Sequence, residues 1–227
     1  MPKSAAELPM MAQPRLAPGD DARIKILDTG ERLLGERGLR GASLREISAA
    51  AGQANTSAVQ YHFGGKAGLI RAIVARRVES FEPRRRELLA DIEARGMLGD
   101  IQELLRVLLL PLAEATDADG RHVYARFLMQ FLVQIRYEEP VEHPGWAPDS
   151  STAHAGKLLL EALPFLGMAG IVARIDRLAG FFLSAIIDRE NAMALGRKLE
   201  LEDDFLADLF SMMAGALSAP AQKSGER

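Results

Sequence analysis

The sequence predicts an all-α protein, and three observations lead to that prediction. Apolar residues recur at spacings of three and four along most of the 227 residues, and no stretch alternates convincingly as a strand would. Residues that start helices, such as Ser43 with Glu46 three positions later, precede several of these runs. Glycines that end helices, such as Gly38 and Gly52, follow them. A chain of this length can bury a core in one large domain or two small ones.

The N-terminal third divides into short helices separated by glycines. Residues 20–37 carry one apolar stripe, and residues 43–51 form a capped second helix; a glycine follows each of them. Asn55 is the next good N-cap, and it opens a short helix that runs from Thr56 to about His62. The sequence therefore predicts a compact unit of three helices ahead of the rest of the chain.

The short third helix offers little to a hydrophobic core. Only Val59 and Phe63, four residues apart, need to face inward to anchor it. Its other side chains include hydroxyls, an amide, a phenol and an imidazole, which are groups that contact base edges and phosphates in the DNA major groove. A polar surface helix without a partner is the alternative interpretation of the same pattern.

Charge is divided unevenly along the chain. The formal net charge is −3, yet residues 1–80 carry twelve basic against eight acidic side chains, and residues 81–227 carry sixteen against twenty-three. A basic N-terminal third joined to an acidic remainder suggests a polyanionic partner for that third only.

One continuous stretch carries a family resemblance. The segments "ILDTGERLLGERGLRGASLREISAAAG" and "NTSAVQYHFGGKAGLIRAI", within residues 26–73, resemble the DNA-binding domain of the TetR family of bacterial transcriptional regulators. The resemblance covers the "ERG" helix end, the "SLREIS" helix, the turn glycine and the "YHFGGK" run that precedes a further apolar helix. It implies a helix-turn-helix domain at the N-terminus and a larger helical domain for ligand binding and dimerisation behind it.

The resemblance also implies roles for individual residues. The start of the third helix would read base edges and thymine methyls, the following polar residues would contact bases or adjacent phosphates, and the second helix would contact the DNA backbone. A lysine at the start of the fourth helix would meet a phosphate, helped by the helix dipole. The implied DNA-binding residues are Ser43, Arg45, Asn55, Thr56, Ser57, Ala58, Gln60, Tyr61, His62 and Lys66.

The chain departs from the family pattern in the turn. The spacing from Gly52 to Phe63 is one residue longer than the family usually has, and we assign the extra residue to the "QAN" segment at residues 53–55. Asn55 then replaces the usual serine cap, and Gln60 stands where the family often has tyrosine. Both changes affect the detail of the base contacts.

The remainder of the chain reads as a larger helical domain. A long helix begins at Lys66 and runs toward Pro83, and a proline-rich loop is expected over residues 138–152. Two phenylalanines and two glutamines share one face of the helical pattern over 122–135. The glutamines either orient a ligand in an apolar pocket or are polar residues at the boundary of the core. These candidate effector-binding residues are Phe127, Gln130, Phe131 and Gln134.

The last two helical patterns, over 168–190 and 202–218, each carry two adjacent apolar stripes, which is more than one core needs. In the TetR family the last two helices form a four-helix bundle with a second subunit, and the resemblance implies that use here. Burial of both helices inside a monomer is the alternative. The candidate interface residues are Ile175, Phe182, Leu209 and Met213.

No enzyme, metal site or cofactor is expected. The chain lacks cysteine, its four histidines lack the spacing of a zinc site, and no phosphate-binding glycine motif occurs. Glu139, Glu142 and His143 are interpreted as a solvated cluster in the proline-rich loop. No run approaches a membrane span and no signal peptide is recognised, so we expect a cytoplasmic protein.

These inferences combine into one expected organisation. A disordered arm over 1–19 precedes a helix-turn-helix domain over 20–66, an effector-binding and dimerisation domain over 67–218 and a disordered tail over 219–227. The expected function is a homodimeric regulator that binds a roughly palindromic DNA operator, as a repressor released by a small, largely apolar effector. A constitutive DNA-binding dimer without a ligand, and a helical ligand-binding protein with a vestigial DNA motif, are the alternatives.

Overall fold

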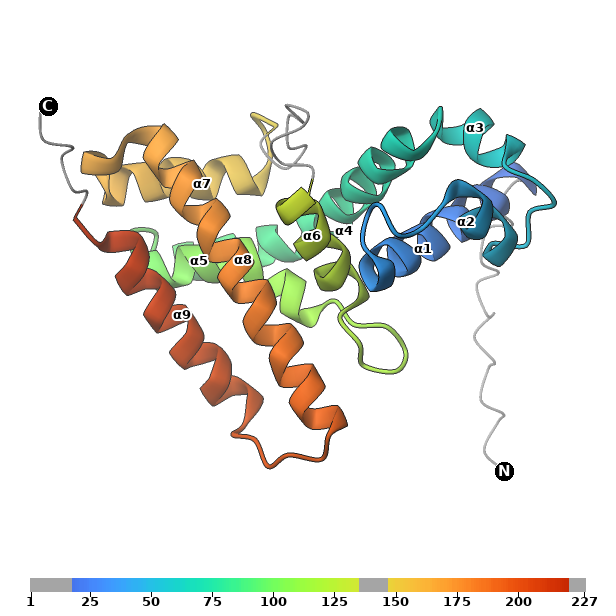
Figure 1. The fold of residues 1–227 in the computed structure, drawn as a ribbon. Coiled ribbons are helices and arrows are strands. Elements are labelled where there is room, and N and C mark those ends of the chain that lie inside the picture. The colour runs from blue at the N-terminus through green and yellow to red at the C-terminus, as the bar shows by residue number, and fades with distance from the viewer. Residues whose placement is uncertain (1–17, 135–146, 221–227) are drawn as a thin grey trace, which may run out of the picture.

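A computed structural model describes residues 18–134 and 147–220, and within those ranges the protein contains helices and no strand (Figure 1). The all-α prediction is therefore confirmed. The elements in chain order are α1 (Pro18–Arg37), α2 (Leu44–Ala50), α3 (Ser57–Phe63), α4 (Lys66–Ala94), α5 (Ile101–Glu114), α6 (Val123–Gln134), α7 (Ser151–Ala162), the 3-10 turn η2 (Pro164–Leu166), α8 (Gly167–Ala194) and α9 (Glu202–Ser218).

The N-terminal unit consists of α1, α2, α3 and the first turns of α4, at the right of Figure 1. Its core contains Ile47, Val59 and Leu69, each completely buried, because one apolar stripe of every helix faces the same centre. Helix α1 begins at Pro18, inside the range expected for the N-terminal arm. The rest of that arm lies outside the described residues.

Helix α4 leaves this unit and becomes part of the second one (Figure 1). The sequence predicted a helix running toward Pro83, whereas α4 continues through that proline to Ala94. A proline inside a helix lacks one N–H donor and clashes with the preceding turn. Buried side chains on both sides of it, among them Phe81 and Leu89, supply the packing that keeps the helix continuous.

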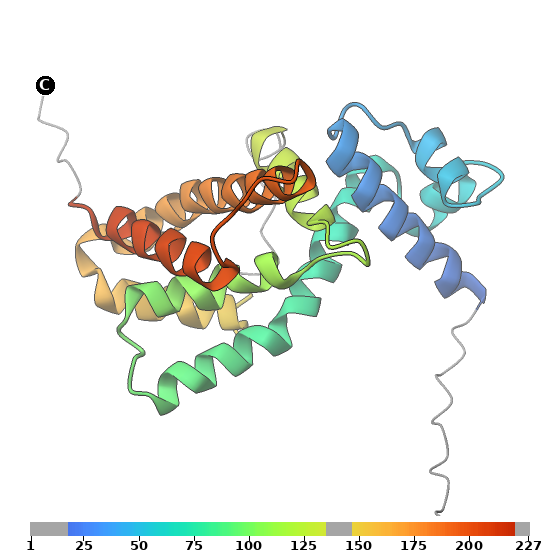
Figure 2. The same cartoon turned by 90° about the horizontal axis from the view of Figure 1, so that it is seen from below.

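The C-terminal domain is built around α5. Residues 104–113 of this helix are almost all buried, so α5 is apolar on nearly every side and packs against α4, α7, α8 and α9. Helices α8 and α9 run side by side and antiparallel along one flank (Figures 1 and 2). Part of the expected proline-rich loop, with Glu139, Glu142 and His143, lies outside the described residues; the chain re-enters at 147, and α7 begins at Ser151.

The four residues expected at a dimer interface are buried inside the protomer. Ile175, Phe182, Leu209 and Met213 all face the protomer core, and the rings of Phe182 and Phe210 lie 5.3 Å apart between α8 and α9. The prediction that these side chains form an exposed apolar face is wrong. Most of the two stripes of each helix is used within the protomer, because α8 and α9 pack against each other as well as against α5. Met212, on one stripe of α9, stays exposed.

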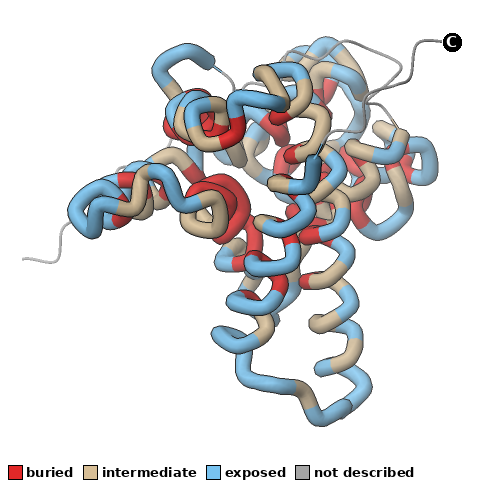
Figure 3. The backbone as a smooth tube through the Cα atoms, turned by 90° about the vertical axis from the view of Figure 1, so that its left-hand side faces the viewer, coloured by how far each residue is buried: buried red, intermediate tan, exposed pale blue. Residues whose placement is uncertain are grey.

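The outer faces of α8 and α9 carry a different set of residues. Phe181 on α8 is 46% exposed and Met212 on α9 is 52% exposed. Figure 3 shows exposed and half-buried residues along the outer turns of the two helices, down to their exposed connecting loop at the bottom of the view.

No single described helix is long and apolar enough to cross a bilayer. One sharply bent pair, α7 with the segment from Pro164 to Ala194, would be so by length and composition only.

Candidate nucleic-acid interface

The start of α2 is fixed by a capping box, as the sequence predicts. The Glu46 backbone N–H donates to Oγ of Ser43 at 3.2 Å, and the Ser43 backbone N–H donates to the Glu46 carboxylate at 2.8 Å. The backbone hydrogen bond from Ser43 lowers the pKa of Glu46, and Arg37 adds to this from 3.1 Å. The Ser43 hydroxyl is therefore already engaged in the cap, while Arg45, one residue into the helix, is exposed.

The turn between α2 and α3 accommodates the extra residue without disturbing α3. Gly52 has φ +74°, a conformation in which a side chain is strained, and the Gln53 N–H donates to the carbonyl of Ser48 at 2.8 Å. The Asn55 side-chain oxygen accepts from the Ser57 N–H at 2.8 Å. Asn55 therefore accepts from the first helical N–H, but the N-cap residue is Thr56, and α3 begins at Ser57, one residue later than predicted.

Helix α3 turns its polar residues outward. Val59 is completely buried and Phe63 is half-buried beneath the guanidinium of Arg23, 5.8 Å from its ring centre. Tyr61 is 85% exposed, which is unusual for an aromatic side chain in a monomeric protein. The inward and outward assignment made from the sequence is therefore confirmed for these side chains.

The remaining α3 candidates differ in exposure. Thr56, Ser57 and Gln60 are exposed, while His62 is half-buried with its ring edge-on to Tyr61 at 5.0 Å. Ala58 is half-buried and packs against the core. It therefore exposes little of the methyl group that would contact a thymine methyl.

Lys66 has an intramolecular role that the sequence did not suggest. Its ammonium donates to the carbonyl of Ala42 at 2.5 Å and so ties the start of α4 to the loop before α2. Burial lowers the pKa of Lys66, and the nearby Glu46 carboxylate opposes that shift. A phosphate contact by Lys66 stays a prediction, and it would have to share the ammonium with this carbonyl.

This geometry agrees with a sequence comparison. Residues 26–73 match the family model of bacterial regulatory proteins of the tetR family. The N-terminal domain is therefore similar to the TetR family over these residues, and we call it the TetR domain. The matched residues begin in α1 and end within the first turns of α4, so they span the two helices of the helix-turn-helix and the turn between them.

The whole chain also has the fold of TetR-family structures. A structure assigned to the tetR family of transcription regulators, from Shewanella sp. PV-4, matches with TM-score 0.57 and 19% identity, over 86% of this chain and 97% of that one. A mutant HlyIIR protein matches with TM-score 0.50 and 18% identity, over 91% of this chain and 100% of that one. Identity this low shows the fold alone. No curated protein sequence matches the chain.

The TetR domain is held to the C-terminal domain through α1. Glu31 on α1 is 1% exposed, and its carboxylate accepts from Nε of Arg77 on α4 at 2.9 Å and pairs with Arg76 at 3.4 Å. Gly35, one turn later, lies against α6 so closely that an added Cβ would be 2.9 Å from the Phe127 nitrogen. Glu31 was not among the residues predicted from the sequence, although a carboxylate on the apolar stripe of α1 indicates a buried partner.

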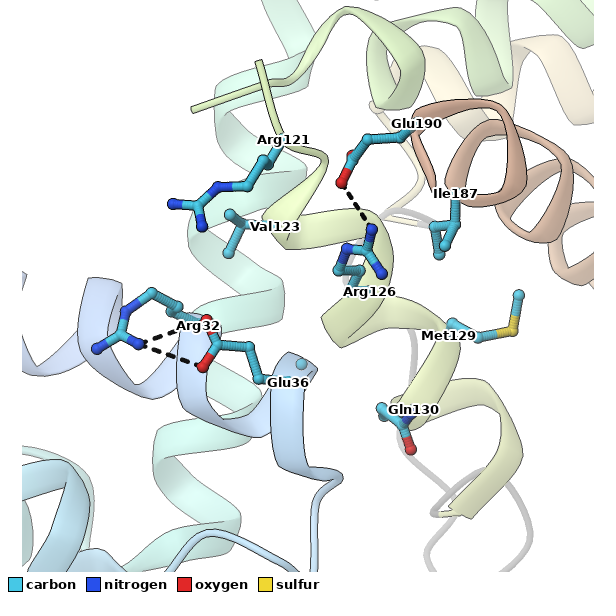
Figure 4. Close-up of a pocket in the computed structure, with 10 residues that line it drawn as sticks. Arg32, Glu36, Arg121, Val123, Arg126, Met129, Gln130, Ile187 and Glu190 are labelled. Atoms are coloured by element: carbon cyan, nitrogen blue, oxygen red, sulfur yellow. Dashed lines mark hydrogen bonds and ion pairs between the residues drawn. The ribbon is translucent and has the colours of Figure 1, made fainter. Parts of the chain in front are cut away.

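A cleft of about 510 Å³ opens beside this junction, between α1, α6 and α8 (Figure 4). Arg32, Arg121 and Arg126 line it, and each already has a carboxylate partner. Arg126 donates to Glu190 of α8 at 2.6 Å, as the dashed line in Figure 4 marks. Burial raises the pKa of Glu190, but the hydrogen bonds from Arg126 and His122 outweigh it, so the pKa is lowered overall.

The four candidate effector residues do not line one common pocket among the described residues. Phe127 and Phe131 are packed in the core. Gln130 lines the cleft beside α1, and Nε2 of Gln134 donates to Oε1 of Gln130 at 2.7 Å. Both amides lie within 3.4 Å of the place that a Cβ on Gly38 would occupy. Both glutamines thus lie at the α1–α6 junction, and a role for them in orienting a ligand stays a prediction.

Proposed function

We propose that the chain is a homodimeric transcriptional regulator that represses by binding a roughly palindromic DNA operator through residues 43–66 of each protomer. The observation that carries this proposal is α3, a short helix anchored by Val59 and Phe63 with Tyr61 and its polar neighbours in solvent. Such a helix has the size and chemistry to enter a major groove, with a second helix crossing the backbone. The TetR-family match over residues 26–73 supports the same interpretation.

Dimerisation is proposed to use the outer faces of α8 and α9. These faces combine exposed Phe181 and Met212 with glycines at 180 and 215, around which the protomer leaves open space. Small residues allow two backbones to approach closely, and the large apolar side chains supply area to remove from water. A two-fold axis there would present two α3 helices together, as half-sites in a palindromic operator require.

Release from DNA is proposed to follow binding of a small, largely apolar effector in the C-terminal domain, in the cytoplasm and without a metal or cofactor. The effector would favour a spacing of the two α3 helices that no longer matches the operator. The contacts of α1 with α4 and α6 offer the mechanical path, because they leave the TetR domain little freedom to move independently of those helices.

Salt-titrated binding of the full chain to duplex DNA tests this function. We expect the logarithm of affinity to fall linearly with the logarithm of salt concentration, since phosphate contacts release counterions. Binding that is equally weak for every duplex would contradict the proposal and favour the vestigial motif. A thermal-shift screen with apolar small molecules separates the ligand-responsive regulator from a constitutive DNA-binding dimer.

A further inference from the structure

Arg85 is a buried cation that forms no ion pair with the residues that the structure describes. It lies on the inward stripe of α4 and is 7% exposed. Its Nη2 donates to the backbone carbonyl of Leu108 on α5 at 3.2 Å. Nε and Nη1, which carry three of the five guanidinium N–H groups, are buried and have no acceptor in the part of the chain that the structure describes.

The nearest carboxylate on α4 is engaged elsewhere. Oε1 of Glu82 accepts from the backbone N–H of Ser151 at 2.9 Å and from its hydroxyl at 2.7 Å, and it pairs with Arg86 at 3.5 Å. Glu82 therefore fixes the start of α7 against α4 and acts on Arg85 only across a distance. Within residues 18–134 and 147–220, no ion pair neutralises Arg85.

A charge in this position is costly unless something pairs with it. Burial lowers the pKa of Arg85, yet a guanidinium stays protonated in proteins and cannot relieve the cost by becoming neutral. Buried polar groups in folded proteins almost always have a hydrogen-bond partner, and an unpaired one calls for an explanation. An anion that arrives from outside the described chain would satisfy both the charge and the free N–H groups.

Aromatic side chains lie beside Arg85, and one of them carries the phenol of Tyr124. Its guanidinium lies 5.6 Å from the ring centre of Phe81, which packs on Tyr124 at 5.7 Å, and Tyr124 stacks on Phe127 at 5.9 Å. On α7, the hydroxyl of Thr152 is also buried and has no hydrogen-bond partner among the described residues; Thr152 follows the serine that binds Glu82. The two unsatisfied groups lie on helices that pack against each other.

We propose that Arg85 anchors a small organic monocarboxylate with an apolar body, bound where α4, α5 and α7 meet. One guanidinium balances one carboxylate, and the planar fork of donors matches carboxylate geometry. The aromatic side chains beside it suit an aliphatic or aryl body. This inference names the chemical class of the proposed effector, and it rests on the proposed function only for the effect of that ligand on DNA binding.

The position of Arg85 also connects the ligand to the TetR domain. The aromatic row from Phe81 through Tyr124 ends at Phe127, whose backbone abuts α1 at Gly35. Arg77, two turns before Arg85 on α4, lies 5.4 Å from the Tyr124 ring centre and binds Glu31 of α1. A ligand that moves α4 relative to α6 would therefore act on both attachments of α1.

The test uses the full chain without DNA and a series of saturated carboxylates from hexanoate to dodecanoate, each beside its primary amide. We expect at least one carboxylate to raise Tm and to bind in calorimetry, and its amide to bind at least about tenfold more weakly. Arg85→Met should abolish the difference between acid and amide. Arg86→Met, on the next residue with an exposed side chain, should preserve it.

Stability without ligand gives a second readout. Because Arg85→Met removes an unpaired buried charge, we expect its Tm without ligand to equal or exceed that of Arg86→Met. If Arg85→Met does not fold, Arg85→Lys keeps the charge but loses the planar fork, and it should bind the carboxylate more weakly than wild type does.

The proposal is overturned if no carboxylate in the series binds, if acid and amide bind equally, or if the variants at Arg85 bind the acid as the wild type does. A carboxylate that binds through Arg85 but leaves DNA affinity unchanged would sustain the ligand site and contradict only its role as an effector.

Discussion

Gly35→Ala should perturb the junction between the TetR domain and the C-terminal domain more than the same substitution at Gly30 of α1 does. A Cβ at this position would lie 2.9 Å from the backbone nitrogen of Phe127, 3.3 Å from its Cα and 3.3 Å from the carbonyl oxygen of Val123. These atoms are backbone, so they cannot rotate away as a side chain can. Helix α1 or α6 must shift instead.

The expected magnitude follows from that contact. Overpacking a well-packed site costs about 1–3 kcal/mol, and the gain in helix propensity from glycine to alanine offsets about 1 kcal/mol of it. The net loss is therefore up to about 2 kcal/mol, which corresponds to a fall in Tm of up to roughly 8 °C in a protein of this size. Operator affinity should change as well, because α1 carries the TetR domain.

Gly30→Ala on the same helix is the matched control. Its Cβ would meet only the ends of flexible side chains, 3.2 Å from Leu69 Cδ2 and 3.4 Å from Ile73 Cδ1, which can yield by a few tenths of an ångström. We therefore expect this variant to be close to neutral in thermal denaturation. If Gly35→Ala proves as stable as Gly30→Ala and binds the operator unchanged, the description of a tight α1–α6 contact is refuted.

Four further predictions concern the DNA-binding face, acid stability and assembly. Tyr61→Ala should weaken operator binding by about 1–3 kcal/mol per subunit contact and leave Tm unchanged, since the ring is in solvent; unfolding of this variant would reverse our assignment of its orientation. Lys66→Ala should cost about 1–2 kcal/mol of stability through the lost hydrogen bond to Ala42. It should also reduce, by about one unit, the slope of log affinity for DNA against log salt concentration. An unchanged slope would show that Lys66 makes no phosphate contact. Burial raises the pKa of Glu82, but hydrogen bonds from Ser151 bring it below its ordinary value of 4.5. The ionised carboxylate therefore stabilises the fold above that pH, and this contribution is lost on acidification. In chemical denaturation, Glu82→Gln should lose less stability than the wild type between about pH 5 and pH 3. Met212→Asp should split the proposed dimer in sedimentation while the protomer stays folded. Phe182→Asp should unfold the protomer, because of these two side chains only Phe182 is buried within it.

The TetR domain was readable from sequence because its determinants are local. The capping box at Ser43, the left-handed Gly52 and the two apolar anchors of α3 each act within a few residues. The one-residue error at the start of α3 arises because Asn55 caps the helix from one position further back than a simple N-cap does.

The C-terminal domain was less readable because packing partners there are distant in sequence. An apolar stripe predicts burial but not the partner that buries it. The doubled stripes of α8 and α9 therefore could not reveal that Phe182 and Leu209 pack within the protomer while Met212 stays exposed. The glutamines on α6 could not be assigned to α1 for the same reason. Arg85 stands within three consecutive arginines, which look like a solvated cluster, and its spacing of four from Phe81 and Leu89 was the available signal.

Selection of bound sequences from a pool of random duplex DNA, with the full-length protein and with Tyr61→Ala in parallel, tests the central claim most directly. The account predicts that the wild type enriches one inverted repeat, with half-sites separated by about one helical turn or a multiple of it. The variant should enrich that repeat weakly or lose preference at positions within each half-site. Enrichment of no common sequence by the wild type, or of the same sequence with the same strength by Tyr61→Ala, would contradict the claim that residues 43–66 read an operator.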